Sequence, residues 1–264
     1  LRMEPVAMPA GLRWLAGDRC TSLASYGGLS EFRADRAPAG AVARCWDGAA
    51  RCPVAAACPF DAVRFYVDRA AGVTGWPVSV ITDDPSPESR LRALATGPYG
   101  RCVYHSDNDM ADHQVTALEF ANGVRATLTV SGLTADNTRT ITLNGTRGEI
   151  RGRLDTGEIE VRSFLPSGEM AALSGPWDHD EFGRSSMPRD GREVLHVSAA
   201  TDGHGGGDDA MLGGVIAGLR AARDGTADRS VARTSLAASV ESHEMAFAAE
   251  VSRRERRLGE LPAP

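Results

Sequence analysis

Apolar and polar residues alternate most clearly between residues 99 and 150. From Val124 to Val130 every second residue is apolar, which is typical of a strand with one buried face. The dipeptide Asn122-Gly123 precedes this run and favours a tight hairpin with the apolar run that ends at Phe120. Further short runs of this kind lie at 21–26, 138–143, 148–150, 157–164 and 193–198. The pattern therefore predicts antiparallel strands joined by short turns.

Helical periodicity appears in the last quarter of the chain. One apolar stripe lies within 209–224, and a second helix is expected from about Thr234. The residues that share one face of this second helix are Leu236, Val240, His243, Phe247 and Val251. We predict that His243 is a core residue on that face. Strands together with such helices predict a single α+β domain over residues 1–264, with a large, mostly antiparallel open sheet and helices on one face.

Four segments carry a family resemblance. They read VYHSDNDMADHQVTALEFANGVRATLTVSGLT, LNGTRGEIRG, GHGGGDDAML and SHEMAFAAEVSR. Together they resemble the C-terminal part of Gfo/Idh/MocA-type oxidoreductases, from about Trp14 to Arg254. The resemblance implies a substrate and oligomerisation domain that follows an NAD(P)-binding Rossmann domain, and it implies a sugar-like or polyol substrate. The chain resembles only the second half of such enzymes, and its first residue is Leu1, which fits a fragment or a trimmed chain.

The resemblance also points to candidate substrate contacts. Asp109 and His113 lie in the polar run SDNDMADHQ, and His204 and Asp208 lie in or beside GHGGGD, where a helix N-terminus favours an oxygen ligand. A solvated turn for the first pair and an exposed histidine for the second remain the alternatives. The glycine run lacks the preceding strand and the spacing of a dinucleotide loop, so we expect no NAD(P) binding there.

Catalytic residues stay unassigned. In the resembling enzymes a His-Asp pair lies shortly before the Trp-Leu dipeptide, and the corresponding positions here are Ala7 and Met8, which cannot transfer a proton. All basic residues are arginine, so no lysine can assist. We therefore expect that this chain alone does not turn over NAD(P), although NAD(P) is the cofactor expected for the intact family enzyme.

Cysteines form the second candidate site. Cys45, Cys52 and Cys58 lie close together in sequence, and Cys102 follows at the start of the alternating region 99–150, so four thiols are available for a tetrahedral zinc ion. Their spacing is wider than in the common zinc knuckles, and the alternative is a set of reduced, partly buried thiols. Cys20 is expected to be an ordinary core residue.

Composition and charge limit the possible partners and cellular location of the protein. The chain has 264 residues and a formal net charge of −6, which disfavours nucleic acid as a partner. No apolar run approaches the roughly 20 residues of a membrane helix, and no secretory signal is recognisable, so we expect a cytoplasmic protein. We also expect a homo-oligomer that associates through the sheet face near Val124 to Val130. The alternatives are a non-catalytic small-molecule-binding or assembly domain and a small metal-binding protein.

Overall fold

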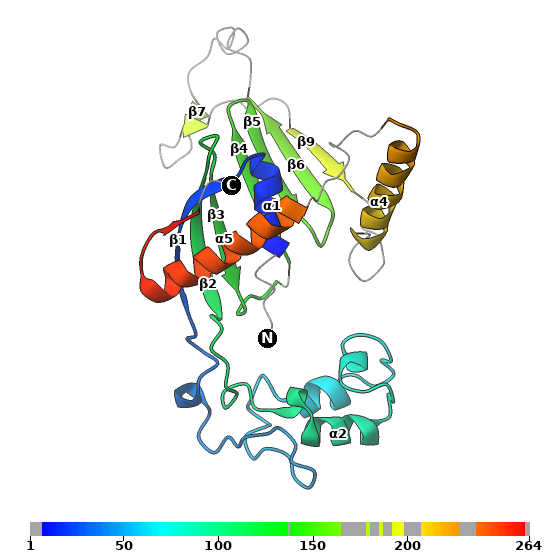
Figure 1. Cartoon of the computed structure of the whole chain (residues 1–264). Helices are drawn as coiled ribbons and strands as arrows, with labels where there is room; N and C mark the ends of the chain where they lie inside the picture. Colours follow the sequence, from blue (N-terminus) through cyan, green and yellow to red (C-terminus); the bar gives the residue numbers. More distant parts are fainter. Residues whose placement is uncertain are drawn as a thin grey trace. The chain divides into compact units, whose positions relative to one another are not determined.

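A computed structural model describes most of the chain. It covers residues 7–136, 138–164, 178–179, 185–186, 192–197, 207–226 and 236–261. Contacts divide the chain into two units, Leu1–Leu133 with Leu236–Pro264, and Thr134–Ser235. Each unit contains an open, four-stranded antiparallel sheet, which confirms the predicted α+β class (Figure 1). The single domain over residues 1–264 stays a prediction.

The first unit is built on the strand order β10-β1-β2-β3. Its strands are β1 (Cys20–Gly28), β2 (His113–Phe120), β3 (Arg125–Ser131) and β10 (Gly259–Glu260). The β2–β3 hairpin turns at Gly123, whose φ of 83° lies in the left-handed region that glycine adopts without strain. The sequence therefore predicted this hairpin correctly.

Helix α5 (Leu236–Glu255) lies across this sheet (Figure 1). Its buried residues are Ser242, Met245, Ala249 and Ser252, and Met245 joins the core formed by Leu23, Leu118 and Phe120. The predicted buried face was wrong, because His243 and the four apolar residues grouped with it are exposed. The small residues permit close approach: the Ser25 N–H donates to Ser252 Oγ at 3.0 Å.

Helix α1 (Ala7–Ala16) packs beside α5. Pro9 lies in the first turn, where an α-helix has no use for the missing N–H. The guanidinium Nε of Arg13 donates to Glu241 Oε2 at 2.7 Å and connects the two helices. Gly17 ends α1 with a φ of 75°, in the left-handed region common at helix ends.

Between β1 and β2 the chain makes a long excursion, which we call the 29–112 segment. It contains short helical turns and one regular helix: Ala34–Arg36, Arg64–Asp68, Val78–Val80, α2 (Pro87–Thr96) and Pro98–Gly100. Ser86 caps α2 by accepting from the Ser89 N–H. The structure describes this segment completely, and its β pairing is confined to two isolated bridges, Arg44 with Arg101 and Trp46 with Arg51.

The second unit has the strand order β4-β5-β6-β9. Its strands are β4 (Thr140–Gly145), β5 (Gly148–Arg153), β6 (Glu158–Ser163) and β9 (Arg192–His196), with β9 at an edge. A short pair, β7 (Asp178–His179) and β8 (Ser185–Ser186), and helix α4 (Gly207–Arg223) complete the described part of this unit. The register places Ile141, Leu143, Ile150, Ile159, Val161 and Leu195 on one face of the sheet.

Candidate functional site

A buried carboxylate lies where the 29–112 segment returns to the sheet. The side chain of Asp112 accepts from the backbone N–H groups of Ser30 and Glu31 at 2.8 and 2.7 Å, and from the Ser30 hydroxyl at 3.0 Å. The ring Nδ1 of His113 lies 2.8 Å from Oδ1 of the Asp112 carboxylate. Burial favours the neutral acid, but these donors outweigh it and hold the pKa of Asp112 well below its usual range. Asp112 is therefore ionised at neutral pH.

The ionised Asp112 fixes the orientation of His113, the first residue of β2. A carboxylate only accepts hydrogen bonds, so His113 Nδ1 carries the proton of this contact. With Nδ1 as the donor, Nε2 is the ring nitrogen left free of this contact, and the side chain is 52% exposed. The arrangement presents one oriented imidazole nitrogen to solvent, where it can accept a hydrogen bond from a hydroxyl or exchange a proton with it.

The other acidic residues of the SDNDMADHQ run are surface groups. Asp109 lies beside Arg254 at the end of α5, with Arg254 Nη2 at 3.3 Å from its carboxylate. Asp107 lies beside Arg101 with a separation of 2.6 Å. The structure thus pairs His113 with its neighbour Asp112, which the sequence interpretation had not selected, and gives Asp109 a different partner. The adjacency of Asp112 and His113 at a strand start was the available signal.

The glycine-rich candidates lie in the second unit. His204 falls outside the described residues. Asp208 is the second residue of α4, and the structure describes its backbone only. The expectation that His204 and Asp208 contact a substrate therefore stays a prediction.

The four candidate metal ligands converge in the 29–112 segment. Cys45, Cys52, Cys58 and Cys102 line one cavity of about 10 Å³. All four thiols are free, and all except Cys52 are buried. Burial raises the pKa of the Cys45 thiol above its usual value, with smaller contributions from Cys58 and Cys102 in the same direction. Cys20 lies apart in the sheet core, as predicted, and burial raises its pKa to about 11.

Lining one cavity does not by itself give the four thiols the geometry of a metal site. Across the described ranges, no three His, Cys, Asp or Glu side chains are arranged to hold a metal ion. The zinc expectation consequently finds no support in ready-made ligand geometry. What the fold does supply is a single small cavity that brings together four thiols from distant positions of the segment.

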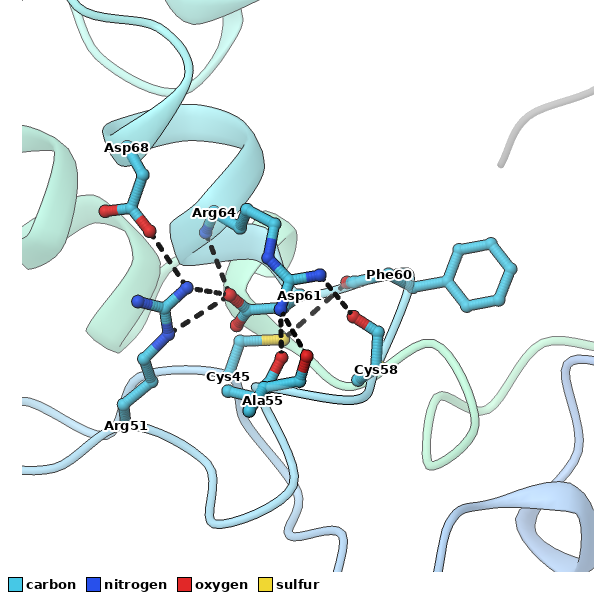
Figure 2. Close-up of polar contacts among 9 residues, drawn as sticks. Cys45, Arg51, Ala55, Cys58, Phe60, Asp61, Arg64 and Asp68 are labelled. Carbon is cyan, nitrogen blue, oxygen red and sulfur yellow. Dashed lines mark hydrogen bonds and ion pairs between the residues drawn. The ribbon is translucent and has the colours of Figure 1, made fainter.

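An arginine and carboxylate network lies beside Cys45 and Cys58 (Figure 2). Asp61 also lines the cavity, its side chain is 1% exposed, and it pairs with the guanidinium of Arg51. The second carboxylate of the network, Asp68, lies 3.0 Å from the same guanidinium. Arg64 donates to the carbonyl oxygens of Ala55, Ala56 and Cys58, the last two at 3.0 Å. Sequence reasoning missed this network because its partners are brought together only by loop geometry.

Comparisons with known proteins support the fold. No protein-family model and no curated protein sequence matches the chain. Among solved structures, an oxidoreductase domain protein from Kribbella flavida is similar at 11% identity with a TM-score of 0.52, covering 97% of this chain and 49% of that chain. The chain therefore spans about half the length of that protein. The resemblance drawn from the sequence motifs is confirmed at the level of the fold.

Two further solved structures are less similar. An NAD-binding protein from Listeria innocua has 11% identity and a TM-score of 0.40, with 97% of this chain and 49% of that chain covered. Levoglucosan dehydrogenase in complex with NADH and levoglucosan has 15% identity and a TM-score of 0.40, with 98% and 64% covered. The fold is shared with the Kribbella protein.

The helices also bear on the expectation about membranes. None of those within the described ranges combines the length and the apolar character that a bilayer crossing demands.

Proposed function

We propose that this chain is the substrate-binding half of a Gfo/Idh/MocA-type NAD(P)-dependent oxidoreductase that acts on a sugar-like or polyol substrate. The sequence motifs and the fold shared with an oxidoreductase domain protein support the class. The observation that carries the site is the Asp112–His113 pair, which presents an oriented imidazole nitrogen at the start of β2. A nicotinamide, when bound in the intact enzyme, would supply or accept the hydride.

In this proposal His113 binds a substrate hydroxyl. Its Nε2 accepts a hydrogen bond from the hydroxyl, and the charge of Asp112 stabilises the ring if it takes up the proton. The buried position of Asp112 and its bonds to the Ser30 and Glu31 backbone keep the ring in place. Residues 1–264 by themselves are proposed not to turn over NAD(P), because they resemble only the second half of such enzymes, contain no lysine, and carry Ala7 and Met8 at the His-Asp positions. A cytoplasmic location remains part of the proposal.

Titration with polyols tests the binding role. Calorimetry of the chain with a panel of sugars and polyols is expected to find saturable binding that His113→Ala weakens about tenfold, as for the loss of one hydrogen bond. The matched control is His243→Ala, since His243 is an exposed histidine elsewhere in the same unit. Equal affinity of His113→Ala and the wild-type chain would contradict the proposed site.

Titration with cofactors tests the proposed inactivity. Fluorescence titration with NADH and NADPH is expected to show no saturation, and a dehydrogenase screen over sugars is expected to show no turnover. Saturable binding with cofactor-dependent turnover would contradict the proposed inactivity and would mean that residues of the sheets and loops hold the nucleotide.

We also propose that the chain self-associates through the apolar face of the second unit's sheet. Leu143, Ile150 and Leu195 on that face are 37 to 43% exposed, which is a large apolar area for a free surface. The β3 region that the sequence favoured offers less area, because Ala126 and Leu128 pack against the core. Light scattering is expected to give a dimer or larger assembly for the wild-type chain and for Thr142→Arg on the opposite face. Ile150→Arg is expected to give a monomer.

A further inference from the structure

The cysteine cavity is the part of the molecule that the proposed oxidoreductase function does not use. It is lined by Cys45, Cys52, Cys58 and Cys102, which come from one loop and from the distant stretch before β2. Thiols in that number, brought together and left free, are the donor set that zinc prefers. The donor chemistry of the cavity therefore fits a soft metal ion.

The size of the cavity limits its occupant. A volume of about 10 Å³ is close to what a single water-sized body needs. An organic cofactor or an iron–sulfur cluster is much larger than this. A single metal ion fits both this volume and the thiol donors.

Asp61 gives an independent indication that something is bound here. It lines the cavity with a side chain that is 1% exposed, and its Oδ2 accepts from Arg51 and from the Arg64 backbone N–H. Its other oxygen, Oδ1, has no donor among the described residues. A buried carboxylate oxygen without a partner is costly, so a positively charged occupant nearby would stabilise it.

The surrounding arginines offset the negative charge that four thiolates would bring. Arg44 lines the cavity, and Arg64 donates to the carbonyl of Cys58, one of the four candidate ligands (Figure 2). Arg51 neutralises Asp61. A zinc ion with four thiolates carries a net charge of about −2, and the guanidinium groups of Arg44 and Arg64 supply a positive environment for it.

The 29–112 segment also has a physical need for a cross-link. It lacks a sheet, and its buried apolar residues form two small clusters, one containing Cys45 and the other containing Cys58 and Cys102. Segments with so little core commonly depend on disulfides or a structural metal. A metal bound by the cysteines would connect the first cluster, through Cys45, to the second, through Cys58 and Cys102.

We propose that Cys45, Cys52, Cys58 and Cys102 bind one structural zinc ion that holds the 29–112 segment together. The thiols are not yet arranged as a ligand group, and metal ligation and local ordering are coupled in small zinc sites. The four side chains are therefore expected to close around the ion when it binds. The site is independent of the substrate contact at His113.

Metal analysis of the purified full chain tests this inference. Mass spectrometry is expected to find about one zinc per chain, as for a tetrahedral structural site. Cobalt titrated into chelator-treated protein is expected to give the visible absorption of tetrahedral cobalt bound to thiolates. Cys102→Ser is expected to abolish both signals, whereas Cys20→Ser, which removes a buried thiol of the sheet core, retains them.

Two results would overturn the inference. One is a wild-type zinc content no higher than that of a variant with all four cysteines replaced by serine. The other is wild-type protein that gives no thiolate–cobalt absorption, a measurement that does not depend on whether any variant folds. A chelator is further expected to lower the melting temperature of the wild-type chain and of Cys20→Ser to the same extent.

Discussion

The sheet of the first unit and the 29–112 segment both have to satisfy buried backbone polar groups, and they do so with different interactions. In the sheet, backbone N–H and C=O groups pair along β1, β2 and β3, and Leu23, Phe120 and Met245 fill one face. In the 29–112 segment, arginine side chains take over the role of the missing backbone ladder. Arg90 is 2% exposed and donates to the carbonyl oxygens of Tyr66, Ala70 and Val73.

This difference teaches how a long excursion without strands remains ordered. Backbone carbonyls in loops need donors when they are buried, and a guanidinium offers five N–H groups in a fixed plane. Arg44 serves Leu94 and Gly97 in the same way, and Arg64 serves the loop around Cys58. The sheet should therefore fail when apolar volume is lost, and the 29–112 segment should fail when a guanidinium is lost.

Phe120→Ala should have the largest effect, on the sheet side of this comparison. Phe120 is 1% exposed in the core beneath α5, and its truncation is expected to reduce the free energy of unfolding by about 4 kcal/mol. Urea unfolding followed by circular dichroism measures the loss. Phe247→Ala is the control, because Phe247 is 66% exposed on α5 and its loss should change stability little. A larger loss for Phe247→Ala would restore the helix face predicted from the sequence.

Arg90→Ala should be the next largest and should act on the 29–112 segment. Three carbonyl oxygens lose their buried donor, which is expected to cost about 3 kcal/mol. Hydrogen exchange should then speed up for amides of the 29–112 segment more than for those of β1 and β2. Arg92→Ala, an exposed change in the same helix, should leave the exchange pattern unaltered. Uniform acceleration throughout the first unit would erase the proposed distinction between the two regions.

Asp112→Asn should have a smaller, pH-dependent effect at the junction of the two regions. An amide in this position turns one acceptor into a donor facing the Ser30 and Glu31 N–H groups, at a cost of about 2 kcal/mol near neutral pH. The folded pKa of Asp112 is depressed, so its stabilisation is complete above the unfolded value of about 4 and is lost as pH falls through the folded pKa.

Urea midpoints at neutral and acid pH check this expectation. The gap between the wild-type chain and Asp112→Asn should narrow as the pH drops below about 4. Asp107→Asn is the comparison variant, since the Asp107 side chain is 86% exposed. A gap that stays constant with pH would mean that Asp112 acts by packing and not by charge.

Gly123→Ala should give the smallest effect. A φ of 83° strains any residue with a Cβ, so the variant is expected to lose about 1 kcal/mol of unfolding free energy. Gly11→Ala should change stability in the opposite direction, because Gly11 lies within α1 and an added Cβ meets nothing within 4 Å. Thermal unfolding of both variants measures the two signs, and a loss in both would argue against the described α1 helix.

The sequence by itself determined the local elements. Alternation around Gly123 and the Ser86 cap are short-range features, because hydrogen bonding and turn chemistry within a few residues decide them. Apolar periodicity did not identify the buried face of α5. The face with small residues packs against the sheet, and Phe247 is exposed to solvent. His243 was placed wrongly for the same reason.

The candidate sites depended on tertiary structure. His113 was recognisable from sequence, but its orientation comes from Asp112. The charge of Asp112 is stabilised by the backbone N–H groups of Ser30 and Glu31, which lie at the other end of the 29–112 segment in sequence. Cys45 and Cys102 were visible as metal-ligand types, whereas the cavity they share with Asp61 required the loop to fold back on itself. Residue type sets which chemistry is available to a side chain, and only long-range packing decides its neighbours, its burial and its charge state.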